Sequence, residues 1–134
     1  RIVFNILSGN TDDHARNHAA FWDGKSLALT PAYDICPQAR TGGEASQAML
    51  ITGENRASKL VVCLEAASHF RLNKKRAAAL IEEQLVAIHE HWPAICEEAG
   101  LSVTERKALW RRQLLNPFIF EDAPQMLARF NTGD

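Results

Sequence analysis

The sequence lacks a disulfide framework, a membrane-length apolar run and a marked excess of charge of either sign. Its three cysteines are far apart and form no C-x-x-C pair, so they indicate reduced thiols in a cytoplasm rather than a disulfide scaffold or zinc site. No apolar run approaches the roughly 20 residues that span a bilayer. The net charge of −1 argues against a surface dedicated to nucleic acid. We therefore expect a globular protein with neither a membrane span nor direct nucleic-acid contact.

A polar stretch near the start of the chain carries residue types that suit phosphoryl transfer. Asp12 and Asn17 are five positions apart, which is the spacing of the catalytic Asp and the metal-binding Asn in the protein-kinase catalytic loop. Asp34 follows as a second carboxylate on a later turn. A carboxylate without a strong cation partner orients a hydroxyl nucleophile and accepts its proton. Asp12 is therefore the candidate catalytic base.

The same stretch offers ligands for a metal–nucleotide complex. Asn17 supplies an amide oxygen and Asp34 a carboxylate, and magnesium prefers such hard oxygen donors beside phosphate oxygens and water. His14 or Arg16 would place positive charge near the transferring phosphoryl group and stabilise its transition state. The candidate catalytic residues are thus Asp12, His14 and Arg16. The candidate ligands for magnesium and ATP are Asn17 and Asp34.

Two runs in this region carry a family resemblance. They are Thr11-Asp12-x-His14-x-Arg16-Asn17 and Leu29-Thr30-Pro31-x-Tyr33-Asp34-Ile35. Together they resemble the catalytic segment of the HipA-like serine/threonine kinases, the toxins of bacterial toxin–antitoxin pairs. The Asp-x-His-x-x-Asn order is also similar to the catalytic loop of phosphatidylinositol 3/4-kinases. The resemblance implies an ATP- and Mg-dependent kinase that phosphorylates a protein substrate on Ser or Thr in the bacterial cytoplasm. It also implies an antitoxin-type DNA-binding partner.

The sequence departs from a whole kinase of this type in one respect. Such an enzyme needs a nucleotide-clamping lobe before the catalytic loop, with a lysine and a loop over the phosphates. This chain has no glycine-rich phosphate loop and no lysine on a suitable strand. We therefore expect residues 1–134 to form a C-terminal kinase lobe that lacks the N-terminal lobe. We expect the isolated chain to be inactive.

The hydrophobic pattern predicts a mainly α fold of the α+β class. This would be the helical C-lobe of a kinase-like fold, with a small β-hairpin carrying the active-site loop. Residues 1–8 are typical of the end of a helix, and Gly9 would stop it. An Asp-Gly turn between two apolar runs predicts a hairpin over residues 17–30. The hairpin would bring Asp34 back beside Asn17.

Two helices are predicted in the middle of the chain. The first covers residues 58–70, with Ser58 as its N-cap. The second begins after Asn73, and its apolar residues recur every three or four positions from residue 77 to residue 99. Pro93 removes a backbone donor within that pattern, so we expect a kink or break there.

The last third of the chain predicts a further helix and an apolar anchor. Ser102 and Glu105 have the spacing of a capping box, and Pro117 would stop the helix that they open. Residues 118–120 are Phe-Ile-Phe, which we expect to dock on the core, and residues 126–130 are expected to form one last helical turn.

Two other functions remain open on the sequence. The first is a metal-dependent hydrolase built on the acidic and imidazole side chains of the loop. These are Asp12, Asp13, His14 and His18. It predicts a tightly bound transition metal without nucleotide, whereas the kinase hypothesis leaves Asp13 solvated. The second is a non-catalytic helical interaction module, which predicts that Asp34 lies far from Asn17 or that substituting Asp12 changes no activity.

Overall fold

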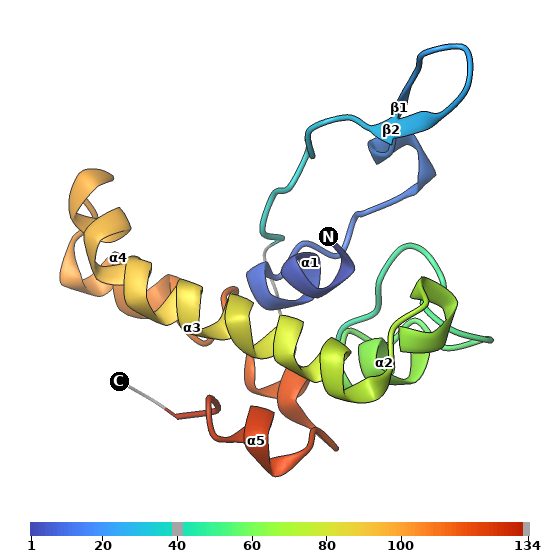
Figure 1. The fold of residues 1–134 in the computed structure, drawn as a ribbon. Helices are drawn as coiled ribbons and strands as arrows, with labels where there is room; N and C mark the ends of the chain where they lie inside the picture. Colours follow the sequence, from blue (N-terminus) through green and yellow to red (C-terminus); the bar gives the residue numbers. More distant parts are fainter. Residues whose placement is uncertain (39–41, 133–134) are drawn as a thin grey trace.

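The computed structural model describes residues 1–38 and 42–132, and in these ranges the protein is mainly helical with one β-hairpin (Figure 1). The α-helices are α1 (Ile2–Ser8), α2 (Leu60–Glu65), α3 (Lys74–Glu98), α4 (Val103–Leu109) and α5 (Gln125–Ala128). The 3-10 helices are η1 (Ala15–Asn17), η2 (Ala66–Phe70) and η3 (Pro117–Phe120). The strands are β1 (Ala20–Trp22) and β2 (Leu27–Leu29). The predicted mainly α fold of the α+β class is confirmed.

The hydrophobic core lies where α1, α2 and α3 meet, and η3 and α5 pack against α2 and α3. Each of these elements contributes fully buried aliphatic side chains. Among them are Ile6, Leu7, Leu60, Ile81, Leu85, Ile119 and Leu127. The carbonyl of Leu7 also accepts a hydrogen bond from the backbone N–H of Leu115 at 2.8 Å. The short helix α1 is thereby fixed in the core, and the polar loop that follows it starts from a rigid base.

Gly9 ends α1, as predicted. Its φ of 75° lies in the left-handed region that glycine adopts without a steric penalty. The Gly9 carbonyl accepts from the backbone N–H of Gln38 at 3.0 Å, so the turn also holds the segment that follows the hairpin. A Cβ atom at Gly9 would lie 2.6 Å from the carbonyl oxygen of Gln113. The position therefore requires glycine for two reasons, its dihedral angle and its close neighbour.

The predicted hairpin is confirmed, and it projects away from the helical body (Figure 1). Its antiparallel register places Ala20 opposite Leu29 and Trp22 opposite Leu27. The Asp23 carboxylate accepts from the backbone N–H groups of Lys25 and Ser26, each at 2.8 Å. These hydrogen bonds lower the pKa of Asp23. Both strands are exposed along their whole length.

Two expectations about helix starts have different outcomes. The helix predicted over residues 58–70 is α-helical only in α2 and continues as the 3-10 helix η2. Ser58 does not cap it, because the Ser58 hydroxyl accepts a hydrogen bond from Gln47 Nε2 at 2.9 Å and the cap position falls on Lys59. The Asn73 cap is confirmed, since its side chain accepts from the backbone N–H of Arg76 at 2.8 Å.

Of the kink or break predicted at Pro93, the break is wrong, because α3 continues through it to Glu98. The proline removes one backbone donor, and the hydrogen bond from Ala99 N to Ile95 O, 2.9 Å long, shows that the ladder resumes beyond it. The predicted apolar stripe leaves the core at the same end, where Ile95 is 53% exposed.

The capping box formed by Ser102 and Glu105 is confirmed, but α4 ends at Leu109 rather than at Pro117. Trp110 adopts an extended conformation because its indole is buried and stacks on Trp92, with ring centroids 5.3 Å apart. Pro117 opens η3, and residues 118–120 are buried against the core, as expected.

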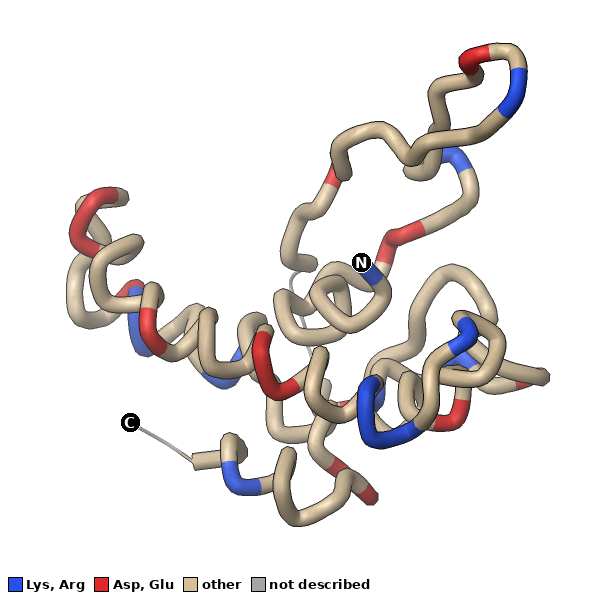
Figure 2. Tube along the Cα trace, in the orientation of Figure 1, with Lys and Arg blue, Asp and Glu red and all other residues tan. Residues whose placement is uncertain are grey.

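Charged residues of both signs are spread along the helices and the hairpin tip rather than gathered in one block (Figure 2). Across residues 1–38 and 42–132, none of the helices combines the length and apolar character needed to cross a membrane.

Candidate active site

The loop between α1 and β1 meets the segment that follows β2, and this meeting forms the candidate site. Asn17, the last residue of η1, donates a hydrogen bond from Nδ2 to Oδ2 of Asp34. The hairpin between them thus returns the chain as its Asp-Gly turn predicted. The hypothesis of a non-catalytic interaction module predicts that Asp34 lies far from Asn17 or that substituting Asp12 changes no activity. The contact contradicts the first of these two expectations.

Asn17 is held in place by its own loop. Its side chain is buried, and Oδ1 accepts from the backbone N–H of His14 at 3.2 Å. The Asn17 backbone N–H donates in return to the His14 carbonyl at 2.9 Å. The imidazole of His14 is half-buried, and within the described part of the chain its Nδ1 has no hydrogen-bond partner. The turn of η1 therefore sets the direction of the Asn17 amide.

Asp12 is exposed, and its carboxylate has no ion-pair or hydrogen-bond partner among residues 1–38 and 42–132. Only its backbone is held, because the Asp12 N–H donates to Asn10 Oδ1 at 3.3 Å. A free carboxylate on a fixed backbone suits the acceptance of a proton from a bound hydroxyl. Arg16 is also exposed, and its carbonyl accepts from the Tyr33 hydroxyl at 2.7 Å.

We expected Asp13 to be solvated, but its side chain is only 4% exposed. Arg1 donates to Asp13 Oδ1 from Nε at 3.1 Å and from Nη2 at 2.8 Å, while His18 Nε2 lies 3.1 Å from both carboxylate oxygens. Arg1 Nη2 also donates to the carbonyl of Tyr33 at 3.0 Å. Asp13 therefore ties the start of α1 to the loop, and its partner Arg1 reaches the residue before Asp34. The sequence did not indicate that Asp13 is buried, because its partner Arg1 is twelve positions away along the chain.

The hydrolase hypothesis finds no support in this geometry. Asp13 and His18 bond each other instead of facing a common centre with Asp12. Within the ranges that the structure describes, no group of three or more His, Cys, Asp or Glu side chains could hold a metal ion. The transition-metal cluster that this hypothesis requires is thus absent from these ranges.

The comparison with known protein families decides the family. The model of the HipA-like C-terminal domain matches residues 1–92, which is more than half of the chain. The chain belongs to the HipA-like C-terminal domain family. The family is related to kinases and to toxin–antitoxin systems in general. No curated protein and no solved structure matches the chain.

The matched region of this HipA-like domain contains the whole candidate site, together with α2 and most of α3. Its oxygen donors fit a magnesium ion by their chemistry. Asp34 Oδ1 has no hydrogen-bond partner among the described residues, and Asn17 Oδ1 retains one lone pair beside the His14 N–H. These two groups are the candidate ligands of the ion. The contact between Asn17 Nδ2 and Asp34 Oδ2 keeps their side chains together.

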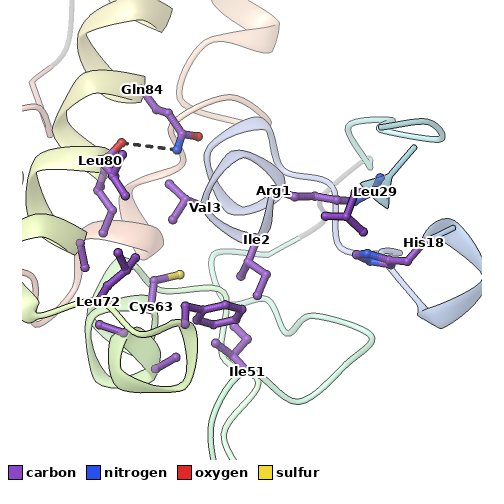
Figure 3. Close-up of a pocket in the computed structure, with 15 residues that line it drawn as sticks. Arg1, Ile2, Val3, His18, Leu29, Ile51, Cys63, Leu72, Leu80 and Gln84 are labelled. Atoms are coloured by element: carbon purple, nitrogen blue, oxygen red, sulfur yellow. Dashed lines mark hydrogen bonds between the residues drawn. The ribbon is translucent and has the colours of Figure 1, made fainter. Parts of the chain in front are cut away.

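An apolar cavity of about 420 Å³ lies between α1, α2 and α3 of the HipA-like domain (Figure 3). Arg1 and His18 contribute polar atoms to its lining, and most of the rest is aliphatic. Cys63 faces this space, and burial raises the pKa of its thiol to about 12. A thiol with such a pKa is a poor nucleophile near neutral pH, so Cys63 is not a candidate catalytic group.

Sequence reasoning missed two supporting residues of the site, Asn10 and Tyr33. Asn10 follows a glycine, and the pair is typical of a turn, so its side chain carried no functional signal. Tyr33 lies within the resemblance, but nothing in the sequence shows that its hydroxyl reaches the carbonyl of Arg16 seventeen positions earlier. The contact of Asn10 with Asp34 and that of Tyr33 with Arg16 each join the segment before the hairpin to the segment after it.

Proposed function

We propose that this HipA-like domain is the catalytic C-terminal lobe of an ATP- and Mg-dependent protein serine/threonine kinase. The observation that carries the proposal is the contact between Asn17 and Asp34, made by the same loop that carries the exposed, unpaired carboxylate of Asp12. Phosphoryl transfer needs a positioned hydroxyl, a metal–phosphate complex and stabilisation of the charge that develops. The site offers Asp12 for the first of these needs, and Asn17 with Asp34 for the second.

Each residue has a distinct task in the proposed mechanism. Asp12 orients the Ser or Thr hydroxyl of the protein substrate and accepts its proton as the oxygen attacks the γ-phosphorus, while the bond from this phosphorus to the β–γ bridging oxygen breaks and ADP leaves. Asn17 and Asp34 would hold magnesium, and the ion would neutralise charge on the phosphates. Arg16, the residue before Asn17, is exposed and is proposed to place its positive charge near the phosphoryl group. His14 is half-buried and its Nδ1 atom is buried, so it is proposed to add positive charge near the phosphoryl group without contacting it through Nδ1.

The wider assignment rests on the family. We propose that a nucleotide-clamping N-terminal lobe completes the enzyme, so residues 1–134 alone would be inactive. The protein target would carry the phosphorylated Ser or Thr, and a DNA-binding antitoxin would be the regulatory partner. ATP and such targets meet in the bacterial cytoplasm, where the kinase would act.

Substituting Asp12→Asn in the intact kinase tests the assignment. The variant removes the proton acceptor and retains the backbone N–H that binds Asn10. Transfer of labelled phosphate from ATP to protein should fall by about 10²- to 10⁴-fold, which is the contribution of a positioned general base. Asp122→Asn is the matched control, because its carboxylate is 75% exposed and outside the site. Full transfer activity in Asp12→Asn would refute the kinase assignment.

A further inference from the structure

Asn10 has a buried side-chain amide that contacts the backbone of the candidate site. Its residue surface is 1% exposed, and it follows Gly9 at the end of α1. Oδ1 accepts from the backbone N–H of Asp12 at 3.3 Å. Nδ2 donates to the backbone carbonyl of Asp34 at 3.4 Å and to Asn5 Oδ1 at 3.2 Å. One planar amide thus contacts the main chain of both Asp12 and Asp34.

The direction of the Asn10 amide is fixed by these two backbone groups. A backbone N–H only donates and a carbonyl only accepts, so Oδ1 must face Asp12 and Nδ2 must face Asp34. No other side chain of this size offers a donor and an acceptor on one rigid plane; an Asp of the same shape lacks the donor when it is ionised. The position therefore selects for the amide and not merely for a small polar residue.

Asp34 needs such support. Its φ is 55°, a left-handed conformation that costs most non-glycine residues about 1–2 kcal/mol and that Asp adopts more readily than most. Strain of this kind persists where surrounding contacts hold the backbone. Asn10 holds the Asp34 carbonyl, and Asn17 holds its carboxylate. Together they aim the Asp34 side chain.

From this geometry we propose that Asn10 is a positioning residue that couples the backbone of Asp12 to that of Asp34. It sets the distance between the proposed base and the proposed metal ligand without touching either substrate. The role in the reaction depends on the proposed kinase function, whereas the coupling itself does not. Loss of the Asn10 donor should release Asp34 and weaken metal binding, while loss of its acceptor should release Asp12.

Two variants separate the two halves of the amide. Asn10→Asp keeps the acceptor for the Asp12 N–H and replaces the donor with an oxygen that repels the Asp34 carbonyl. Asn10→Ala removes both. Asn116→Asp is the matched control, because Asn116 is also buried, accepts from Phe118 N at 3.1 Å and donates to Arg112 O at 3.0 Å. It makes the same chemical change away from the site.

The first measurement needs no nucleotide. NMR of the 134-residue chain follows amide hydrogen exchange at Asp12 and the carbonyl ¹³C shift of Asp34. We expect Asn10→Asp to change the Asp34 carbonyl shift and leave Asp12 exchange near that of the wild type. We expect Asn10→Ala to change both, with Asp12 exchange about tenfold faster, the effect of one lost hydrogen bond. Unchanged signals at both residues in Asn10→Ala would overturn the coupling.

The second measurement uses the intact kinase. Mn²⁺ replaces Mg²⁺, and its binding in the presence of ATP is followed by electron paramagnetic resonance beside phosphoryl transfer. Asn10→Asp should weaken Mn²⁺ binding by about tenfold and lower kcat, whereas Asn116→Asp should lower only the melting temperature. Wild-type Mn²⁺ affinity and kcat in Asn10→Asp would overturn the positioning role.

The two claims fail in different ways. If the wild-type intact protein neither binds Mn²⁺ with ATP nor transfers phosphate, the proposed kinase function fails. The exchange and carbonyl signals of the chain still decide whether Asn10 couples Asp12 to Asp34.

Discussion

Substituting Gly9→Ala should destabilise the fold more than any comparable glycine change, because two separate penalties coincide there. Gly9 has a φ of 75°, and a left-handed alanine costs about 1–2 kcal/mol. The new Cβ would also lie 2.6 Å from the Gln113 carbonyl oxygen, which is a backbone atom and cannot rotate away. Overpacking of this kind costs about 1–3 kcal/mol. The expected loss of unfolding free energy is therefore about 2–5 kcal/mol.

Gly100→Ala provides the matched control. Gly9 is itself the C-cap of α1, whereas Gly100 follows Ala99, the C-cap of α3, but its φ of 66° carries the same left-handed penalty. A Cβ atom there would meet nothing within 4 Å. The control should lose only about 1–2 kcal/mol, and the entropic benefit of replacing glycine in the unfolded chain is common to both variants.

Urea unfolding followed by circular dichroism measures both free energies. The m-value should stay constant, so that midpoint shifts report stability alone. The reasoning predicts that Gly9→Ala is less stable than Gly100→Ala by about 1–3 kcal/mol. Equal losses in the two variants would show that the Gln113 carbonyl does not restrict the turn, and the steric reason for glycine at this position would be refuted.

Two further predictions concern buried groups. Asp13→Asn should lower the unfolding free energy by about 1–3 kcal/mol, because the Arg1 guanidinium loses its charged partner while the amide oxygen still accepts one hydrogen bond. An unchanged free energy of urea unfolding would contradict the buried ion pair. Burial raises the pKa of Cys63 from 9.0 to about 12, so between these pH values the unfolded chain binds fewer protons at this thiol than the folded chain. The Cys63 contribution to stability should therefore fall as pH rises through that window, and Cys63→Ala should flatten the slope measured by urea unfolding; an identical slope in both proteins would contradict the assignment.

Features of the fold that depend on neighbouring residues were predictable from sequence. Gly9 and Asn73 mark helix ends through backbone angles and local hydrogen bonds that a short stretch specifies. The approach of Asp34 to Asn17 was predictable for a related reason. A tight Asp-Gly hairpin has a fixed register, so residues on either side of it return to one another.

Features that depend on distant packing were not predictable. Ser58 has the sequence context of a cap, but its hydroxyl bonds Gln47 from another part of the fold. Trp110 lies within a helical sequence pattern, yet its backbone is extended and its indole stacks on Trp92. Burial of Asp13 likewise depends on a partner that only the tertiary fold supplies. In each case a long-range contact outweighs a local preference of about 1 kcal/mol.

The central claim is that Asn17 and Asp34 hold the metal of a nucleotide complex. Calorimetric titration with ATP and magnesium tests it most directly, applied to the intact parent protein, to its Asp34→Ala variant and to the 134-residue chain. The account predicts binding by the parent, binding weakened about tenfold or more in Asp34→Ala, and none by the chain alone. Binding by Asp34→Ala equal to that of the parent, or no binding by the parent at all, would contradict it.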